Sequence, residues 1–197
     1  MRGLIRVSVE VALFGILAAI IFSQGKRIQL LQTAVEEVAF GDSLAPGTVL
    51  PSFRAVDVSG KEHEINYGAA NARPRIFYAL TPSCGWCRAN HLATNSLARQ
   101  ISARYDIIGL SLSEEGLVAF AKDTEAEFPI LKKVPDSIIK AYHLQGTPAT
   151  IVVSAEGKVI KGWRGAYGVS LQPVIEKFFS VRLPPLSNGS PAAGFSM

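Results

Sequence analysis

The sequence predicts an α/β fold built around a stretch in the middle of the chain. The residues Arg75–Leu80 (RIFYAL) are apolar and aromatic, as in a buried strand. After a Thr-Pro-Ser break, Cys84-Gly85-Trp86-Cys87 opens a segment that continues as a helix to about Ala103. Two further apolar runs, Tyr105–Leu112 and Ala149–Val153, also have the composition of buried strands. Buried strands that alternate with helical segments indicate a mixed α/β fold.

The overall composition fits one domain with additions at its ends. The chain has 197 residues, of which 48% are hydrophobic, so it has enough apolar side chains for a core. Its net charge of +4 arises from scattered lysines and arginines, so we expect a solvated surface and no nucleic-acid partner. The two cysteines both lie in the one motif, which leaves none for a structural disulfide elsewhere.

Residues 1–24 are predicted to form an uncleaved signal anchor that crosses a membrane once. The apolar run Leu4–Phe22 approaches the roughly 20 residues that a spanning helix needs. No small-residue cleavage site follows the run, which favours an anchor over a cleaved signal peptide. Arg2 and Arg6 favour a cytoplasmic amino terminus, a bias that basic residues after the run weaken. We therefore expect an inner-membrane protein whose folded domain faces the periplasm or another extracytoplasmic space.

The rest of the chain divides into three parts. Residues 25–46 are predicted as a helical stalk and a linker, since apolar residues recur at helical spacing over Lys26–Phe40 and glycine and proline follow. Residues 47–182 contain the folded domain. Residues 183–197 have the composition of a disordered tail.

Within the domain, each predicted element has a local signal. A β-hairpin is expected at Val49–Val58 and Lys61–Ile65, around a Ser-Gly turn. Ser113 is expected to be the N-cap of a helix over Glu114–Lys122, because two glutamates suit its first turn. The remaining predicted elements are a short strand or extended segment at Phe128–Leu131, a helix at Asp136–Leu144, a strand at Val159–Trp163 and a final helix at Ser170–Val181 with Pro173 in its first turn.

The two cysteines are expected to be the catalytic residues. A C-x-x-C that a strand delivers onto the first turn of a helix is typical of the redox motif of the thioredoxin fold. The free N–H groups and the positive dipole end of a helix favour an anion, so we expect the pKa of Cys84 to fall from about 8.5 toward neutrality or below. Cys87, one turn further on, is expected to be more shielded. We therefore predict that Cys84 attacks and that Cys87 resolves.

From about Ala45 to Val181 the chain resembles the membrane-anchored TlpA/ResA-type thiol–disulfide oxidoreductases. The matching features are the hairpin sequence GTVLPSFRAVDVSGKEHEI, the CGWC helix start and the later run HLQGTPATIVVSAEGKVI. The resemblance implies a thioredoxin fold with an N-terminal β-hairpin extension and a helical insertion. It implies protein thiol and disulfide substrates, a membrane electron donor, and a reducing role such as maturation of apocytochrome c or a similar client. Neither a cofactor nor a metal is expected.

The resemblance also implies roles for residues outside the cysteine pair. The family has a cis-proline against the active-site disulfide at the position of Pro148. Such a proline removes a backbone donor near the sulfurs and leaves the backbone of Thr147 free to pair with an extended substrate segment. Trp86, between the cysteines, is expected to be exposed and to contact partner proteins.

The sequence departs from the family pattern near the motif. Ser83 precedes the first cysteine where many relatives have Trp, and Tyr78 stands where thioredoxins have a buried Asp that assists proton transfer. Asn90 stands where some relatives have an acidic residue, so the usual proton acceptor for Cys87 is missing. The run before Cys84 (FYALTPS) is also similar to that of thioredoxin-like accessory proteins of methylamine dehydrogenase maturation.

Three other interpretations remain open. Thr81 to Cys84 fit the T-x-x-C of peroxiredoxins, although the proline expected four residues before that Thr is absent. The two cysteines with His91 or His143 are candidate copper ligands, as in Sco-like chaperones of this fold, although those space their cysteines by three residues. A redox-inert scaffold is the third, although a scaffold needs neither the cysteines nor Pro148.

Overall fold

The computed structural model describes residues 15, 21–25, 44–70 and 72–187. The predicted membrane helix at residues 1–24 and the predicted stalk and linker at 25–46 lie almost entirely outside these residues. Within the described part of the chain, no helix has both the length and the apolar composition that crossing a membrane requires. The compact unit Asp42–Met197 contains the whole of the sheet described below.

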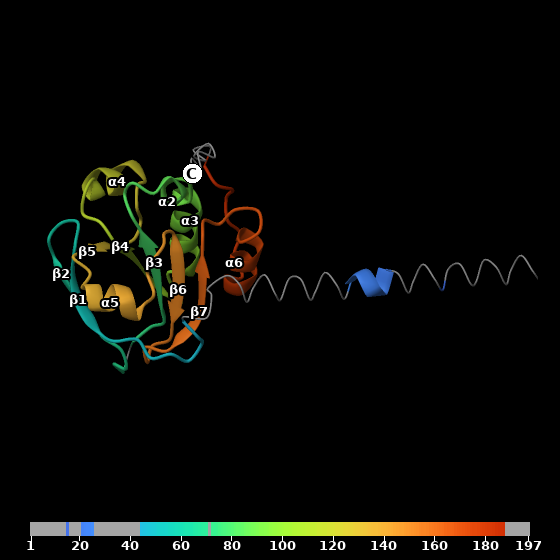
Figure 1. Ribbon diagram of the computed structural model, residues 1–197, viewed down its shortest axis with the longest axis horizontal. Helices are drawn as coiled ribbons and strands as arrows, with labels where there is room; N and C mark the ends of the chain where they lie inside the picture. Colours follow the sequence, from blue (N-terminus) through green and yellow to red (C-terminus); the bar gives the residue numbers. More distant parts are fainter. Residues whose placement is uncertain (1–14, 16–20, 26–43, 71, 188–197) are drawn as a thin grey trace, which may run out of the picture. The chain divides into compact units, whose positions relative to one another are not determined.

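The described residues form one mixed sheet of seven strands in the order β2-β1-β5-β4-β3-β6-β7 (Figure 1). β3 is parallel to β4 and antiparallel to β6, so it is buried between two neighbours. Five of its six residues are buried, as expected for a central strand. The strands are β1 (Phe53–Asp57), β2 (Glu62–Ile65), β3 (Arg75–Leu80), β4 (Asp106–Ser111), β5 (Ile130–Lys132), β6 (Ala149–Val153) and β7 (Val159–Arg164).

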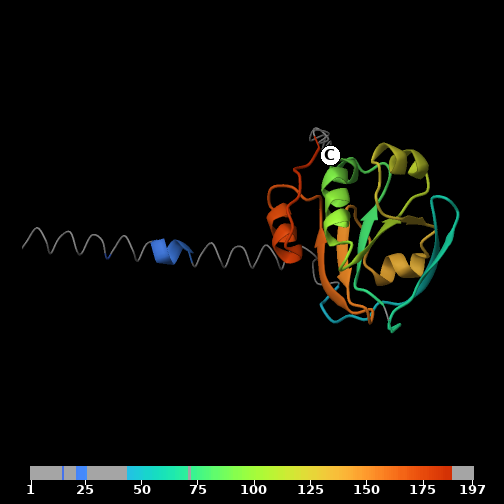
Figure 2. The same ribbon diagram turned by 180° about the vertical axis from the view of Figure 1, so that it is seen from behind.

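Helices pack against both faces of this sheet. Successive residues of a strand point to opposite faces, and β3 shows both sides. Phe77 contacts Tyr142 at the end of α5, with the ring centroids 5.4 Å apart, whereas Tyr78 packs in a cluster with Cys87 and Phe120. Figures 1 and 2 show the two sides. The helices are α2 (Gly85–Ala89), α3 (His91–Ile101), α4 (Leu117–Asp123), α5 (Asp136–Ala141) and α6 (Gln172–Phe179).

The element order confirms the predicted thioredoxin-like α/β fold. β3, the motif helices, β4, α5, the β6–β7 hairpin and α6 follow one another as predicted. The predicted N-terminal hairpin is present as β1 and β2, and β1 joins the sheet by pairing with β5. α4 and β5 account for the predicted insertion. Pro173 lies in the first turn of α6, as expected.

The motif helix is broken, where the sequence predicts one helix to about Ala103. α2 ends at Ala89 and α3 begins at His91, with Asn90 between them at φ −83° and ψ −6°. The ψ of Asn90 departs from the helical value of about −42°. The break lies at a side chain that is fully buried and bonded to two other parts of the domain, as described below.

The start of α4 also differs from the prediction. Ser113 is not its N-cap, because α4 begins at Leu117 after Gly116, which has φ +73°. A residue with a side chain rarely adopts this left-handed conformation, and glycine adopts it freely. The two glutamates lie in the turn before it, where the Ser113 hydroxyl accepts from the Glu115 N–H at 3.3 Å.

The segment after α6 is ordered further than its composition predicts. Leu183 is buried, and its carbonyl accepts from the Gln172 side chain at 2.8 Å. The Ser187 N–H donates to the carbonyl of Ala89, the last residue of α2, at 2.9 Å. Residues 183–187 thus pack against the domain, while 188–197 lie outside the described residues.

Candidate active site

Cys84 lies where the chain turns from β3 into α2. Its N–H donates to the carbonyl of Thr81 at 3.1 Å, which closes the turn. Cys84 is the N-cap residue of α2, and its Sγ accepts from the N–H of Cys87 at 3.1 Å. A donor aimed at the sulfur stabilises its anionic form more than its neutral form. Since α2 has only five residues, its dipole is small. The bond from the Cys87 N–H therefore contributes more than the helix dipole to stabilising a Cys84 thiolate.

The two cysteines form a pair with unequal exposure. Their sulfurs lie within disulfide-bonding distance, and their Cα atoms are 5.2 Å apart. Cys84 is half-buried, whereas Cys87 is 1% exposed and packs against Tyr78 and Phe120. A partner protein therefore reaches Cys84 more readily than Cys87. Their assignment as attacking and resolving residues stays a prediction.

The sheet brings Thr147 and Pro148 to the cysteines across more than sixty residues of sequence. β6 begins at Ala149 and pairs with Ala79 near the end of β3, so the chain before β6 lies beside the turn after β3. The carbonyl oxygen of Thr147 lies 3.7 Å from the Sγ of Cys84. The Thr147–Pro148 peptide bond is cis, as the family resemblance implies.

Trp86 lies at the surface of the site. It is 44% exposed although it is a large apolar side chain, in agreement with the expected exposure. An exposed aromatic residue between two reactive cysteines is suited to contact a partner. Its role in binding stays a prediction.

A buried polar network lies on the Cys87 side of the sheet. The Asn90 Nδ2 donates to the hydroxyl of Tyr78 at 3.1 Å, and its Oδ1 accepts from the N–H of Tyr167 at 2.9 Å. The Tyr167 and Thr150 hydroxyls are 2.8 Å apart. Burial raises the pKa of Tyr78 and of Tyr167 well above the usual value for a phenol, so both remain neutral.

This network was missed at the level of sequence. Asn90 could be recognised only as a departure from a family pattern, yet it is a structural residue that joins α2, β3 and the chain after β7. Trp163 and Tyr167 are both buried.

The side chain of Arg88 pairs with a residue of α4. Its guanidinium pairs with Asp123 of α4 at 3.2 Å and lies 5.3 Å from the centre of the Phe120 ring. The charge of Arg88 is thus directed toward α4.

The contacts around the cysteines give little support to the two alternative interpretations, a copper site and a peroxidase site. Within the described part of the chain, no group of three His, Cys, Asp or Glu residues is placed to hold a metal ion. The Thr81 hydroxyl lies 3.4 Å from the Thr147 hydroxyl.

Together the fold and the paired cysteines define a thioredoxin-like domain with a C-x-x-C at a helix start. The chain belongs to the AhpC/TSA family, whose profile matches residues 46–161. No curated protein sequence matches it.

Solved structures of this fold resemble the domain over most of their length. The thioredoxin domain of a thiol-disulfide oxidoreductase from Bacteroides vulgatus is 24% identical, with a TM-score of 0.55, and the match covers 70% of this chain and 99% of that one. A thiol:disulfide interchange protein from Bacteroides sp. is 24% identical, with a TM-score of 0.54 and coverage of 70% and 92%. StoA from Bacillus subtilis is 18% identical, with a TM-score of 0.52 and coverage of 65% of this chain and 96% of StoA. These likenesses show the fold.

Proposed function

We propose that this protein is a thiol–disulfide oxidoreductase that exchanges disulfides with partner proteins through Cys84 and Cys87. The observation that carries the proposal is the pairing of a half-buried Cys84, which accepts an N–H bond, with a buried Cys87 at disulfide distance. The names of the solved structures of the same fold, which are thiol-disulfide oxidoreductases, support it.

The reaction follows from the unequal exposure of the two sulfurs. In the reducing direction, the Cys84 thiolate attacks one sulfur of a partner disulfide and releases the other as a thiolate, giving a mixed disulfide. The Cys87 thiol then loses its proton and attacks Cys84, which releases the second partner sulfur. The partner gains two electrons, and the protein ends with a Cys84–Cys87 disulfide. The oxidising direction is the same path reversed.

The substrate segment is proposed to bind beside Thr147. Its carbonyl is already close to the Cys84 sulfur, so an extended chain that pairs with the Thr147 backbone would place its own sulfur near the nucleophile. Trp86 is the exposed apolar contact at the same end of α2.

The finer assignment is a TlpA/ResA-type protein held in the inner membrane by residues 1–24. The apolar run after two arginines supports an anchor with the domain outside the cytoplasm. The resemblance supports a reducing role with a membrane electron donor, in the maturation of cytochrome c or of another envelope protein.

The test is trapping of mixed disulfides by the full-length chain in its own membrane. With Cys87→Ala, we expect partner proteins to accumulate on Cys84, to be released by reductant and to be identified by mass spectrometry. The matched control is Cys84→Ala with Cys87→Ala, which should capture none. A redox-inert scaffold would instead capture no partner with either variant and would tolerate Cys84→Ser without a phenotype.

A further inference from the structure

Cys87 needs a proton acceptor that the residues beneath it do not supply. The inference below rests on the proposed function, in which the Cys87 thiol must lose its proton before it resolves a mixed disulfide. Cys87 is 1% exposed, so bulk water has little access to it. Tyr78 packs against it as a neutral phenol, and the Asn90 amide beside that phenol is not a base.

A small cavity adjoins Cys87. Its volume is about 10 Å³, about what one water molecule requires. Most of its lining is apolar, but His91 and the hydroxyl-bearing Thr94 and Thr124 also line it. His91 is the only imidazole among the described residues that line the cavity with Cys87.

The hydrogen bond of His91 determines where its free lone pair lies. Its Nδ1 is 2.8 Å from the carbonyl oxygen of Arg88. A carbonyl oxygen only accepts, so Nδ1 carries the proton. In the neutral ring, Nε2 therefore holds the lone pair and is the atom that accepts a proton.

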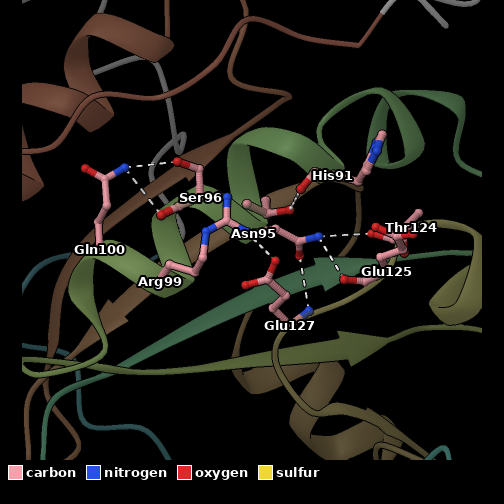
Figure 3. A network of polar contacts seen from close by, with 9 residues as sticks. His91, Asn95, Ser96, Arg99, Gln100, Thr124, Glu125 and Glu127 are labelled. Atoms are coloured by element: carbon pink, nitrogen blue, oxygen red, sulfur yellow. Dashed lines mark hydrogen bonds and ion pairs between the residues drawn. The ribbon is translucent and has the colours of Figure 1, made fainter.

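The wall of the cavity is fixed by Asn95 of α3. Its Nδ2 donates to the carbonyls of Thr124 and Glu125, both at 3.0 Å, and its Oδ1 accepts from the N–H of Glu127 at 3.2 Å (Figure 3). These bonds hold the segment after α4 against α3, on which His91 is the first residue. The cavity is thus formed by three elements that are bonded together.

Three charged residues lie on the elements next to His91. From α2, Arg88 contributes a positive charge, and from α4, Asp123 pairs with it at 3.2 Å. From the segment after α4, Glu125 is exposed and its carbonyl is bonded to Asn95.

We propose that His91 is the proton acceptor for Cys87 in the resolving step. The proton leaves the Sγ of Cys87 and reaches the Nε2 of His91, either directly or through one water molecule in the cavity. The resulting thiolate attacks the Sγ of Cys84, the Cys84–partner bond breaks, and the partner leaves as a thiolate. In the reverse direction, the imidazolium returns the proton to Cys87.

The bond from His91 to the Arg88 carbonyl also has a structural role, because it satisfies a carbonyl at the end of α2. The test variant must keep that donor and remove the base. His91→Asn does so, since the amide nitrogen of Asn takes about the place of Nδ1 and an amide does not titrate near neutral pH. The matched control is His143→Asn, at a position with φ +51° that Asn tolerates.

The experiment measures the resolving step alone. Reduced full-length protein is mixed with dithiobis(nitrobenzoate), whose disulfide Cys84 attacks to give a Cys84–thionitrobenzoate mixed disulfide and one coloured thiolate. The release of the second coloured thiolate by Cys87 is then followed from pH 5 to pH 10. In the wild type, we expect the rate to level off below the pH range in which a thiol ionises, because the imidazole takes the proton of Cys87. In His91→Asn, we expect a rate at least about tenfold lower at pH 7, which recovers only as the thiol itself ionises above about pH 8.5. His143→Asn should match the wild type.

An unchanged rate and pH profile in folded His91→Asn would overturn the inference. If that variant does not fold, the pH profile of the wild-type release rate tests the inference by itself. A rate that rises only as the thiol ionises would exclude an imidazole acceptor. Loading of Cys84 and trapping of partners by Cys87→Ala do not involve His91. Their failure would remove the proposed function, whereas their success with an unchanged His91→Asn would remove this inference alone.

Discussion

The Asn90 Nδ2 donates to the Tyr78 hydroxyl at 3.1 Å, at the point where the motif helix breaks. Asn90 also accepts the N–H of Tyr167, so one amide ties α2 to the central strand and to the chain after β7. A redox site whose second cysteine is buried depends on such a fixed support, because the sulfurs must return to the same geometry after each cycle.

Asn90→Ala is expected to destabilise the domain. The change leaves the Tyr78 hydroxyl and the Tyr167 N–H buried without their partner, which costs about 2–4 kcal/mol in the free energy of unfolding. Urea denaturation of the oxidised protein measures this. Ser96→Ala, on the partly exposed side of α3, should change the free energy of unfolding by less than about 0.5 kcal/mol. Equal effects of the two changes would contradict the structural role of Asn90.

Alkylation is expected to distinguish the two cysteines of the reduced protein. Cys84 should react with iodoacetamide at least about tenfold faster than Cys87 at pH 7, since it is more exposed and accepts an N–H bond. The pH dependence of its rate should give an apparent pKa below the usual thiol value of about 8.5. Peptide mapping after a short pulse measures the two rates, and similar labelling of both would be evidence against the proposed division of roles.

Trp86→Ala is expected to weaken exchange with protein partners only. The side chain is exposed, so its loss should leave stability and the rate with oxidised glutathione almost unchanged. With a protein disulfide, KM should rise by about tenfold if Trp86 is a main contact. Steady-state rates on the two substrates measure this. The matched control is Val118→Ala, another exposed apolar residue. A parallel loss on glutathione would point to a structural role.

Thr81→Val distinguishes disulfide exchange from peroxidase chemistry. Its hydroxyl contacts Thr147 at 3.4 Å, a weak bond whose loss should change the disulfide-exchange rate by about twofold or less. A peroxidase would need that hydroxyl to polarise the peroxide. Reductant-coupled assays with a disulfide and with hydrogen peroxide compare both activities, and peroxide consumption that disappears with Thr81→Val would favour the peroxidase.

Asp57 is expected to stabilise the β1–β2 hairpin in a pH-dependent way. Hydrogen bonds from Ser59 and His63 lower the pKa of Asp57 in the folded state. Its stabilising effect is therefore present above the unfolded-state pKa of about 3.9 and is lost as the pH falls through the folded-state pKa. Asp57→Asn should unfold more easily than the wild type at pH 7, and the difference should shrink below about pH 4. Thermal melts at several pH values check this, with Glu114→Gln as an exposed control.

The sequence alone determined those parts of the protein that depend on neighbours along the chain. The strand Arg75–Leu80 has the predicted bounds, because a short apolar run that ends at a turn signal is typical of a buried strand. The β6–β7 hairpin and the placement of the cysteines at a helix start were likewise predictable. The family resemblance added the position of Pro148, which local composition does not specify.

The tertiary structure decided what depends on contacts between distant segments. The break at Asn90 follows from bonds to β3 and to the chain after β7. The cavity lined by Cys87 and His91 is also lined by a segment some thirty residues away, which Asn95 holds in place. Periodicity and composition describe one element at a time, whereas a buried polar contact depends on which elements meet, and that is set by the packing of the whole sheet.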